Sequence, residues 1–220
     1  MTDRFHTGNF NSIVDELASR DADLKRVVDT YGYPPMWSRQ EGFETLVLII
    51  LEQQVSLASA FAAFTKLKTF LGTITPAGVM GMTDAELRSC YFSRQKSGYV
   101  RDLAGRIIAG ELDLATLSQL PEAELRSRLK AVKGIGDWTV DVYLMFCLQF
   151  PDYFPFGDIA LVNSLRTEKG LDKSVQREQL RLIAEEWKPW RTIAGMILWH
   201  AYICRRSMKL PDSYNKVQAP

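Results

Sequence analysis

The sequence contains few of the residues that bind metals or cross-link secreted proteins. Two histidines, His6 and His200, and three cysteines, Cys90, Cys147 and Cys204, are scattered through 220 residues. Zinc and iron–sulfur sites need clusters of these side chains, so the sequence argues against both kinds of metal centre. The odd number and wide spacing of the cysteines also favour a reducing compartment over a disulfide framework.

Long apolar runs and an excess of one charge are equally scarce. The longest apolar runs, such as residues 46–51, are far too short to cross a bilayer, and the N-terminus carries no secretory signal. Lys and Arg number 27 against 26 Asp and Glu, which gives a net charge of +1. We therefore expect no membrane partner, and any DNA contact must depend on local features.

Strand signals are also rare, whereas helical periodicity runs through most of the chain. A helix is expected to start at the capping sequence Thr83–Glu86. Apolar residues at helical spacing predict the other helices, over 11–20, 22–31, 43–53, 56–71, 95–110, 121–131, 137–149, 159–169, 175–187 and 189–208. The sequence thus predicts an all-α protein, a single domain over residues 1–220 with a frayed tail at 211–220.

The segment LKAVKGIGDWT, residues 129–139, predicts a helix, a tight turn and a second helix. Gly134 and Gly136 flank Ile135 and allow the backbone to approach a ligand closely. The N-terminus of the following helix would favour an anion such as phosphate. Basic side chains that could add positive field lie just upstream: Arg126, Arg128, Lys130 and Lys133. An ordinary helical corner with a glycine C-cap fits the same glycines, so they leave both interpretations open.

Asp158 follows the aromatic loop Tyr153–Gly157 and precedes an apolar run that starts at Ile159. This position predicts a helix N-cap. Cap amides and the helix dipole would keep the carboxylate ionised. A fixed anion could also stabilise positive charge that develops in a reaction beside it. Capping and catalysis are compatible, so Asp158 is a candidate for both.

Five ordered motifs resemble the helix-hairpin-helix superfamily of base-excision DNA glycosylases, and in particular its 3-methyladenine DNA glycosylase II branch. They lie between residues 34 and 205: Pro34–Trp37 with Gly42–Leu46, Glu52–Ser56, Phe92–Ala104, Val132–Thr139, and Trp187–Arg191 with Leu198–Trp199. The resemblance implies two helical lobes with an active-site cleft between them, in a compact form without an N-terminal β domain. It also implies a monomer that binds double-stranded DNA with a damaged base, in a bacterial cytoplasm near the nucleoid or in a nucleus.

The resemblance also implies roles for individual residues. Asp158 would be the catalytic residue, and Gly157 stands where some relatives have a second acid. The base pocket would include Trp138, Trp199, Tyr153 and Phe154, although Trp138 and Trp199 also fit a helical core. Trp187 and Trp190 are assigned to the core. DNA would contact Gln53, Gln54, Lys133, Gly134, Ile135, Gly136 and Thr139. Gln54 would enter the duplex where relatives often have leucine; taken alone, such paired glutamines mark a solvent-facing helix end.

Trp138 bears on the type of chemistry. Endonuclease III and 8-oxoguanine glycosylase resemble this fold but carry a lysine at that position, which attacks the sugar. An indole cannot do so, which implies a monofunctional enzyme that uses water and leaves an abasic site. Alkylated purines such as 3-methyladenine and 7-methylguanine are cationic, which suits an aromatic pocket.

No cofactor is required for that reaction, although the resemblance allows Na⁺ or K⁺ at the backbone of Val132 and Ile135. Two alternatives stay open. One is a glycosylase for a deaminated, etheno or oxidised base, and the other is a non-catalytic helix-hairpin-helix module that only binds DNA.

Overall fold

The computed structural model describes residues 4–210, so the predicted frayed tail at 211–220 lies outside the described residues. Within that range the chain forms twelve α-helices, one 3-10 helix and no strand, which confirms the all-α prediction. The helices fall into two compact units. The split unit combines Met1–Ser38 with Leu144–Pro220, and the inserted unit is Arg39–Tyr143. None of the helices within residues 4–210 is long and apolar enough to cross a membrane.

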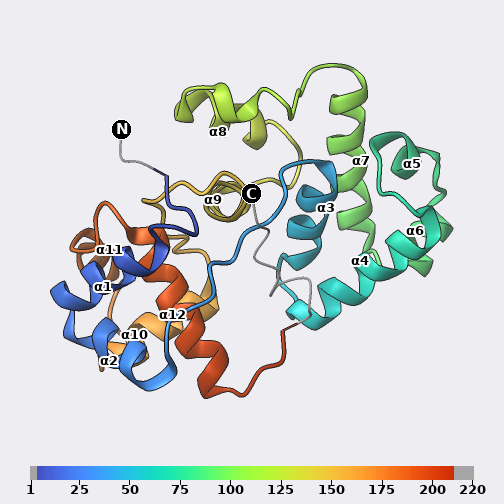
Figure 1. The fold of residues 1–220 in the computed structure, drawn as a ribbon. Coiled ribbons are helices and arrows are strands. Elements are labelled where there is room, and N and C mark those ends of the chain that lie inside the picture. Colours follow the sequence, from blue (N-terminus) through green and yellow to red (C-terminus); the bar gives the residue numbers. More distant parts are fainter. Residues whose placement is uncertain (1–3, 211–220) are drawn as a thin grey trace. The chain divides into compact units, whose positions relative to one another are not determined.

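The split unit is built around its last helix. Its helices are α1 (Phe10–Arg20), α2 (Ala22–Tyr31), α10 (Ile159–Glu168), α11 (Arg177–Glu185) and α12 (Arg191–Arg205). Every residue of α12 from Thr192 to Leu198 is buried, and α1, α2 and α10 pack against it (Figure 1). Asp21, the N-cap of α2, accepts hydrogen bonds from Lys169 Nζ (2.7 Å) and Trp187 Nε1 (2.7 Å). These contacts join the two ends of the chain in one core.

The inserted unit is a continuous run of helices, four of which have side-chain N-caps. It contains α3 (Phe43–Glu52), α4 (Leu57–Leu71), α5 (Pro76–Gly81), α6 (Asp84–Ser89), α7 (Arg94–Ile108), the 3-10 helix η1 (Leu117–Gln119), α8 (Glu122–Lys130) and the first part of α9 (Asp137–Phe146). The side chains of Ser56, Thr75 and Ser93 cap α4, α5 and α7. Thr83 and Glu86 form the predicted capping box of α6.

Helix ends account for most differences from the sequence prediction. The helix predicted over 137–149 stops at Phe146, where the amide of Phe150 turns back to the carbonyl of Leu144. Gln149 has a φ of 54°, which no helix interior accommodates. α5 was not predicted, because six residues are too few to show helical periodicity.

Candidate functional site

The predicted hairpin is present between α8 and α9, with Gly134 at its tip. Gly134 has a φ of +85°, a conformation that favours glycine. The amide of Ile135 donates to the carbonyl of Val132 (3.1 Å), which closes the turn. The Ile135 side chain is only 5% exposed. The side chain of Ile135 is therefore not available to a ligand, and this residue can contribute only backbone groups.

α7 supports the hairpin from behind with two side chains. The ring of Tyr99 lies so close to Gly134 that a Cβ atom there would sit 2.2 Å from Tyr99 Cδ2. Asp102 Oδ2 accepts a hydrogen bond from the amide of Lys133 (2.8 Å). Burial raises the pKa of Asp102, but the hydrogen bonds from Lys133 and Arg106 outweigh it, so that the pKa lies below its usual value. The sequence did not identify Tyr99 or Asp102 as part of the site, because no local pattern shows that they lie next to the hairpin.

Gln53 and Thr139 stabilise the hairpin from inside the inserted unit. Gln53 Nε2 donates to the carbonyl of Gly134 (2.9 Å) and to Thr139 Oγ1 (3.0 Å). Thr139 is 2% exposed, which leaves its hydroxyl no surface for the DNA contact expected from the sequence. The two side chains thus orient backbone groups that could bind a ligand.

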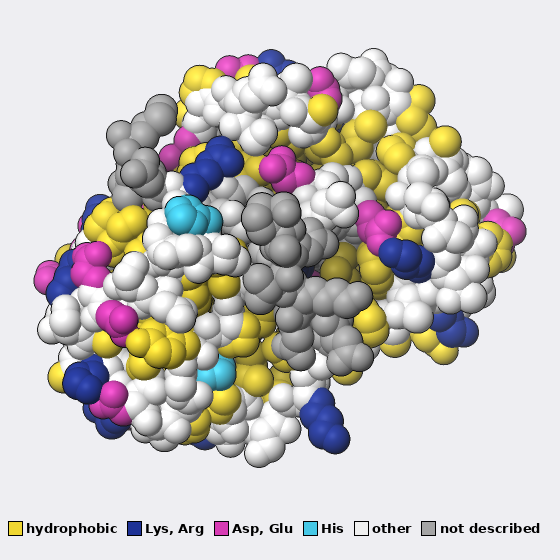
Figure 2. All heavy atoms as spheres, in the orientation of Figure 1, with side chains coloured by type: hydrophobic (Ala, Val, Ile, Leu, Met, Phe, Trp, Pro, Cys, Tyr) yellow, Lys and Arg dark blue, Asp and Glu magenta, His cyan; other side chains and the backbone are white. Residues whose placement is uncertain are grey.

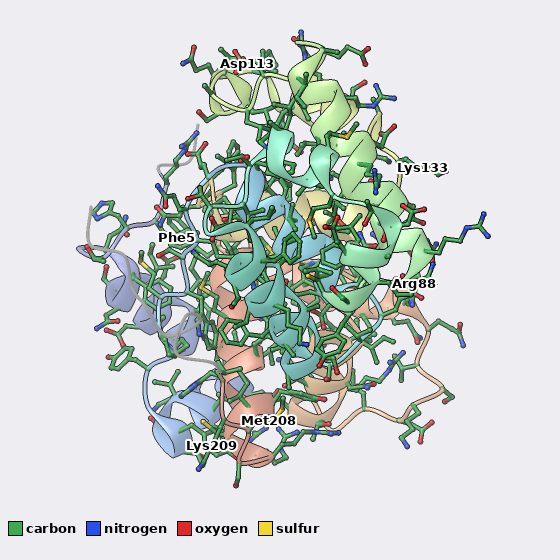
Figure 3. The ribbon with its side chains drawn as sticks, turned by 90° about the vertical axis from the view of Figure 1, so that its right-hand side faces the viewer. Phe5, Arg88, Asp113, Lys133, Met208 and Lys209 are labelled. Atoms are coloured by element: carbon green, nitrogen blue, oxygen red, sulfur yellow. The ribbon has the colours of Figure 1, made fainter. Side chains whose placement is uncertain are left out.

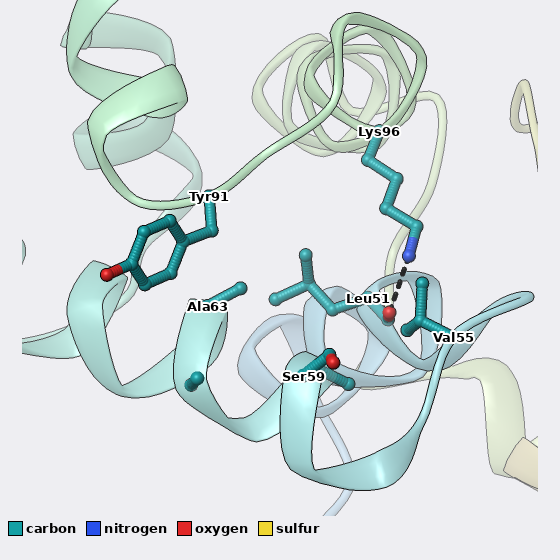
Figure 4. Close-up of a pocket in the computed structure, with 8 residues that line it drawn as sticks. Leu51, Val55, Ser59, Ala63, Tyr91 and Lys96 are labelled. Atoms are coloured by element: carbon teal, nitrogen blue, oxygen red, sulfur yellow. Dashed lines mark hydrogen bonds between the residues drawn. The ribbon is translucent and has the colours of Figure 1, made fainter.

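Gln54 differs from its neighbour. It is exposed and has a φ of 57°, a left-handed conformation that is uncommon outside glycine. Just before it, Lys96 Nζ donates to the carbonyl of Leu51 (2.6 Å), on the last turn of α3. Burial lowers the pKa of Lys96. Lys96 lines a cavity of ≈ 340 Å³, together with Leu51, Val55, Ser59, Ala60, Ala62, Ala63 and Tyr91 (Figure 4).

Most of the basic side chains near the hairpin are neutralised by carboxylates. Arg126 pairs with Asp141 and Glu122, Arg128 pairs with Glu124, and Lys130 pairs with Asp137 (2.7 Å). Lys133, in contrast, is exposed and points outward (Figure 3). Cations and anions are likewise interspersed on the face drawn in Figure 2. The positive field expected from four residues is therefore concentrated at Lys133.

In the split unit, Asp158 is the N-cap of α10, as predicted. Its Oδ1 accepts a hydrogen bond from the amide of Leu161 (2.8 Å), and its own amide donates to the carbonyl of Pro155 (2.8 Å). The carboxylate thus lies at the positive end of the α10 helix dipole. Asp158 is half-buried, so solvent can still reach it.

The loop before Asp158 is tied to the start of α12. Thr192 is fully buried, and its amide donates to the carbonyl of Pro151 (2.9 Å). Its hydroxyl donates to the carbonyl of Phe150 (2.7 Å) and accepts from the amide of Tyr153 (3.1 Å). Arg191 forms a bidentate pair with Asp152, at 2.7 and 3.0 Å. This double attachment fixes the direction from which the chain reaches Asp158.

The candidate pocket aromatics have different environments. Trp199 is half-buried and stacks on Phe146, with ring centroids 5.2 Å apart and planes at 28°. Tyr153 is half-buried against Phe150. Phe154 is only 6% exposed and packs on Trp187, so its ring belongs to the core rather than to an open pocket.

The environments of Phe146 and Trp190 differ from what the sequence predicted. Phe146 was missed because α9 is apolar on several faces, so no pattern singled it out. Trp190, expected in the core, is only half-buried and its Nε1 donates to Glu16 (3.0 Å). Trp138 is half-buried on α9, in the inserted unit.

The described residues include no group of three His, Cys, Asp or Glu side chains that could hold a metal ion. The carbonyl of Val132, suggested for a monovalent cation, accepts one hydrogen bond from Ile135. A carbonyl has a second lone pair, so this oxygen still fits such an ion.

Known proteins resemble this chain over most of its length. The model for the HhH-GPD superfamily base excision DNA repair proteins matches residues 47–189. DNA-3-methyladenine glycosylase 1 of Schizosaccharomyces pombe is 30% identical over 211 residues, which cover 93% of this chain and 90% of that protein. A DNA-3-methyladenine glycosylase of Bacillus subtilis is 27% identical over 84% of this chain, which spans only 65% of that protein.

A solved structure shares the fold as well. It is a 3-methyladenine DNA glycosylase of Schizosaccharomyces pombe in complex with abasic DNA, with a TM-score of 0.77 and 28% identity. The superposition covers 86% of this chain and 95% of that one. Together with the match over residues 47–189, these likenesses show that the chain belongs to the HhH-GPD superfamily of base excision DNA repair proteins.

Proposed function

We propose that the protein is a monofunctional DNA glycosylase that removes alkylated purines of the 3-methyladenine and 7-methylguanine class. The observation that carries this proposal is the carboxylate of Asp158, held by the amide of Leu161 at the N-terminus of α10. The names of the two relatives and the abasic DNA in the solved structure support the same reaction class.

In the proposed reaction the N-glycosidic bond breaks and its electron pair leaves with the purine. An alkylated purine already carries positive charge, so it departs neutral and needs no general acid. The sugar becomes an oxocarbenium-like cation, which the fixed carboxylate of Asp158 stabilises. Water then adds to the anomeric carbon and gives up a proton to solvent, which leaves an abasic site.

Trp138 supports the monofunctional assignment. Its position is the one where the resembling strand-cleaving enzymes carry a lysine, and an indole nitrogen is no nucleophile for the sugar. We therefore expect no covalent adduct between the protein and DNA after borohydride reduction. A trapped adduct at this stage would contradict the assignment.

The base would stack on aromatic rings. Trp199, backed by Phe146, offers a half-buried indole that suits a cationic purine. Trp138 and Tyr153 are further candidates. Trp199→Ala should weaken excision of 7-methylguanine more than that of a neutral lesion such as hypoxanthine, because it removes a cation–π contact. Equal losses for both bases would argue for a structural role of Trp199.

The partner would be double-stranded DNA that contains a damaged base, bound by a monomer. The backbone of the half-buried Gly134 and the exposed Gly136, with the side chain of Lys133, would hold a backbone phosphate. The reaction needs no cofactor. Na⁺ or K⁺ on the carbonyls of Val132 and Ile135 would only reinforce the turn.

The decisive experiment replaces Asp158 with Asn. Asn is as good an N-cap as Asp, so the fold should persist while the charge is lost. Release of 7-methylguanine from methylated DNA should fall by about 10²-fold or more, the usual range for loss of a charge that stabilises a transition state. DNA binding should stay intact.

A matched control is Asp172→Asn, since Asp172 Oδ1 also accepts a backbone hydrogen bond, from Ser174 (2.8 Å). This variant should retain full activity. Full activity in Asp158→Asn would overturn the catalytic assignment. Binding without any abasic product in the wild type would point to a non-catalytic module, and a panel of single-lesion duplexes would reveal a different base.

A further inference from the structure

We propose that Gln53 is a positioning residue that couples the phosphate-binding hairpin to the loop entering the duplex. The inference rests on the proposed function, because it assumes that both elements meet the same DNA. It concerns a side chain that touches neither the base nor the sugar, and it assigns the two adjacent glutamines separate tasks.

Gln53 binds two groups that lie 81 and 86 residues away from it in the sequence. One amide group donates to the carbonyl of Gly134 (2.9 Å) and to the hydroxyl of Thr139 (3.0 Å). Gly134 forms the tip of the turn, and Thr139 belongs to the first turn of α9. The side chain thus fixes the turn relative to the helix start. Those are the two sources of amides that a phosphate would use.

The other end of Gln53 is equally well fixed. It directly follows α3, whose last turn is held by the hydrogen bond from Lys96 to Leu51 (2.6 Å). Glu52, at the end of α3, forms a bidentate pair with Arg39, both at 2.9 Å. The exposed Gln54 comes next, in a left-handed conformation that folded proteins retain only when the surroundings demand it. A displacement of Gln54 is therefore passed to the hairpin through its neighbour.

The hairpin does not depend on Gln53 for its existence. Tyr99 packs against Gly134, and Asp102 holds the amide of Lys133, both from α7. Removal of Gln53 should thus leave a folded hairpin whose tip is less strictly oriented. A loss of preorganisation of this kind lowers binding affinity without new clashes.

The test compares Gln53→Met with Gln176→Met. Gln176 Nε2 also donates to a backbone carbonyl, that of Ser174 (2.9 Å), but it lies in the split unit near α11. The probe is a duplex with a tetrahydrofuran abasic analogue and 2-aminopurine opposite it. The affinity and its salt dependence report binding of the DNA phosphate at the hairpin. The 2-aminopurine fluorescence at saturating protein reports insertion of the Gln54 loop into the DNA duplex.

For Gln53→Met we expect Kd to rise about tenfold and the 2-aminopurine signal at saturation to fall to about half, because grip and entry are coupled. Gln176→Met should change neither, even if its melting temperature falls equally. Lys133→Met should weaken binding and reduce its salt dependence, yet leave the saturated signal unchanged. This contrast separates coupling from affinity alone.

A second variant guards against misfolding. Gln53→Glu can still accept a hydrogen bond from Thr139 but cannot, when ionised, donate to Gly134. It should therefore reproduce the loss of the Met variant. If both variants bind within twofold of the wild type and give its full signal, the inference fails and the proposed function stands. If the wild type binds no duplex at all, both fail together.

Discussion

The hairpin at 131–136 and the turn at 155–158 both lead into a helix N-terminus, but the roles of backbone and side chain are reversed between them. At the hairpin the backbone is the candidate ligand-binding group, and side chains such as Asp102 and Gln53 hold it in place. At the turn the carboxylate of Asp158 is the candidate functional group, and a backbone amide holds it.

Two aspartates make the contrast concrete. Asp102 and Asp158 both accept a backbone hydrogen bond of 2.8 Å. In the first case the amide belongs to the candidate ligand-binding segment, and in the second it belongs to an ordinary helix. The same kind of hydrogen bond thus fixes a backbone amide at the hairpin and a side-chain carboxylate at the turn. The difference predicts which substitutions damage stability and which damage chemistry.

The largest effect on stability is expected from Gly134→Ala. A Cβ atom would meet the ring of Tyr99, and the positive φ disfavours any side chain. Together these should cost about 3 kcal/mol, which lowers Tm by roughly 10 °C in a chain of this size. Gly136→Ala is the control, because nothing lies within 4 Å of its Cβ position.

A Tyr99→Ala background sharpens this test. Without the ring, Gly134→Ala should cost only the backbone strain, about 1 kcal/mol. Calorimetry of the four proteins in this cycle gives the coupling directly. An additive result would mean that the ring does not restrict the tip of the hairpin.

Asp158 should behave differently on truncation. Asp158→Ala removes the cap and should cost about 1 kcal/mol, or roughly 2–4 °C in Tm, whereas Asp158→Asn should cost little. Both variants should lose activity by about 10²-fold or more. If Asn were as destabilising as Ala, the charge rather than the capping hydrogen bond would hold α10, and the comparison with the hairpin would break down.

The pH dependence of stability should reveal Asp102. Its pKa is lowered in the folded protein, so its contribution is present at neutral pH and is lost as pH falls through the folded pKa. The difference in Tm between wild type and Asp102→Asn should be largest near pH 7 and should shrink below about pH 4. A constant difference between pH 3 and pH 7 would rule out this contribution.

The smallest effect is expected from Asp137→Asn. Its carboxylate is paired with Lys130 (2.7 Å), and this hydrogen bond, rather than burial, lowers its pKa. Because the pair is exposed, DNA affinity at low salt should rise by about twofold or less. A much larger increase that disappears at high salt would show that Asp137 faces the phosphate.

Local signals allowed a good part of the molecule to be predicted from its sequence. The capping box at Thr83 and the N-cap at Asp158 were both expected and both present. Each depends on residues three positions apart, so the chemistry is visible in a short window. The hairpin followed in the same way from its glycines and the flanking helices.

What could not be predicted depends on contacts between distant segments. Gln53 lies 81 residues from the carbonyl that it binds, and nothing near it in the sequence marks that partner. Burial of Phe154 and Thr139 is likewise decided by packing. The sequence predicted that both side chains would reach a ligand. That prediction failed because residue type and position in a motif do not reveal which way a side chain points.

The attachment of the aromatic loop to Thr192 has a consequence for biosynthesis. The inserted unit, Arg39–Tyr143, is a continuous stretch and can fold as soon as it leaves the ribosome. The segment before Asp158 is held by Thr192, about forty positions downstream, and cannot be fixed until that residue has been synthesised. The core around α12 also requires α1, α2 and α10. A nascent chain should thus form its hairpin early and fix the Asp158 carboxylate last, so that a prematurely terminated polypeptide would leave this carboxylate unpositioned.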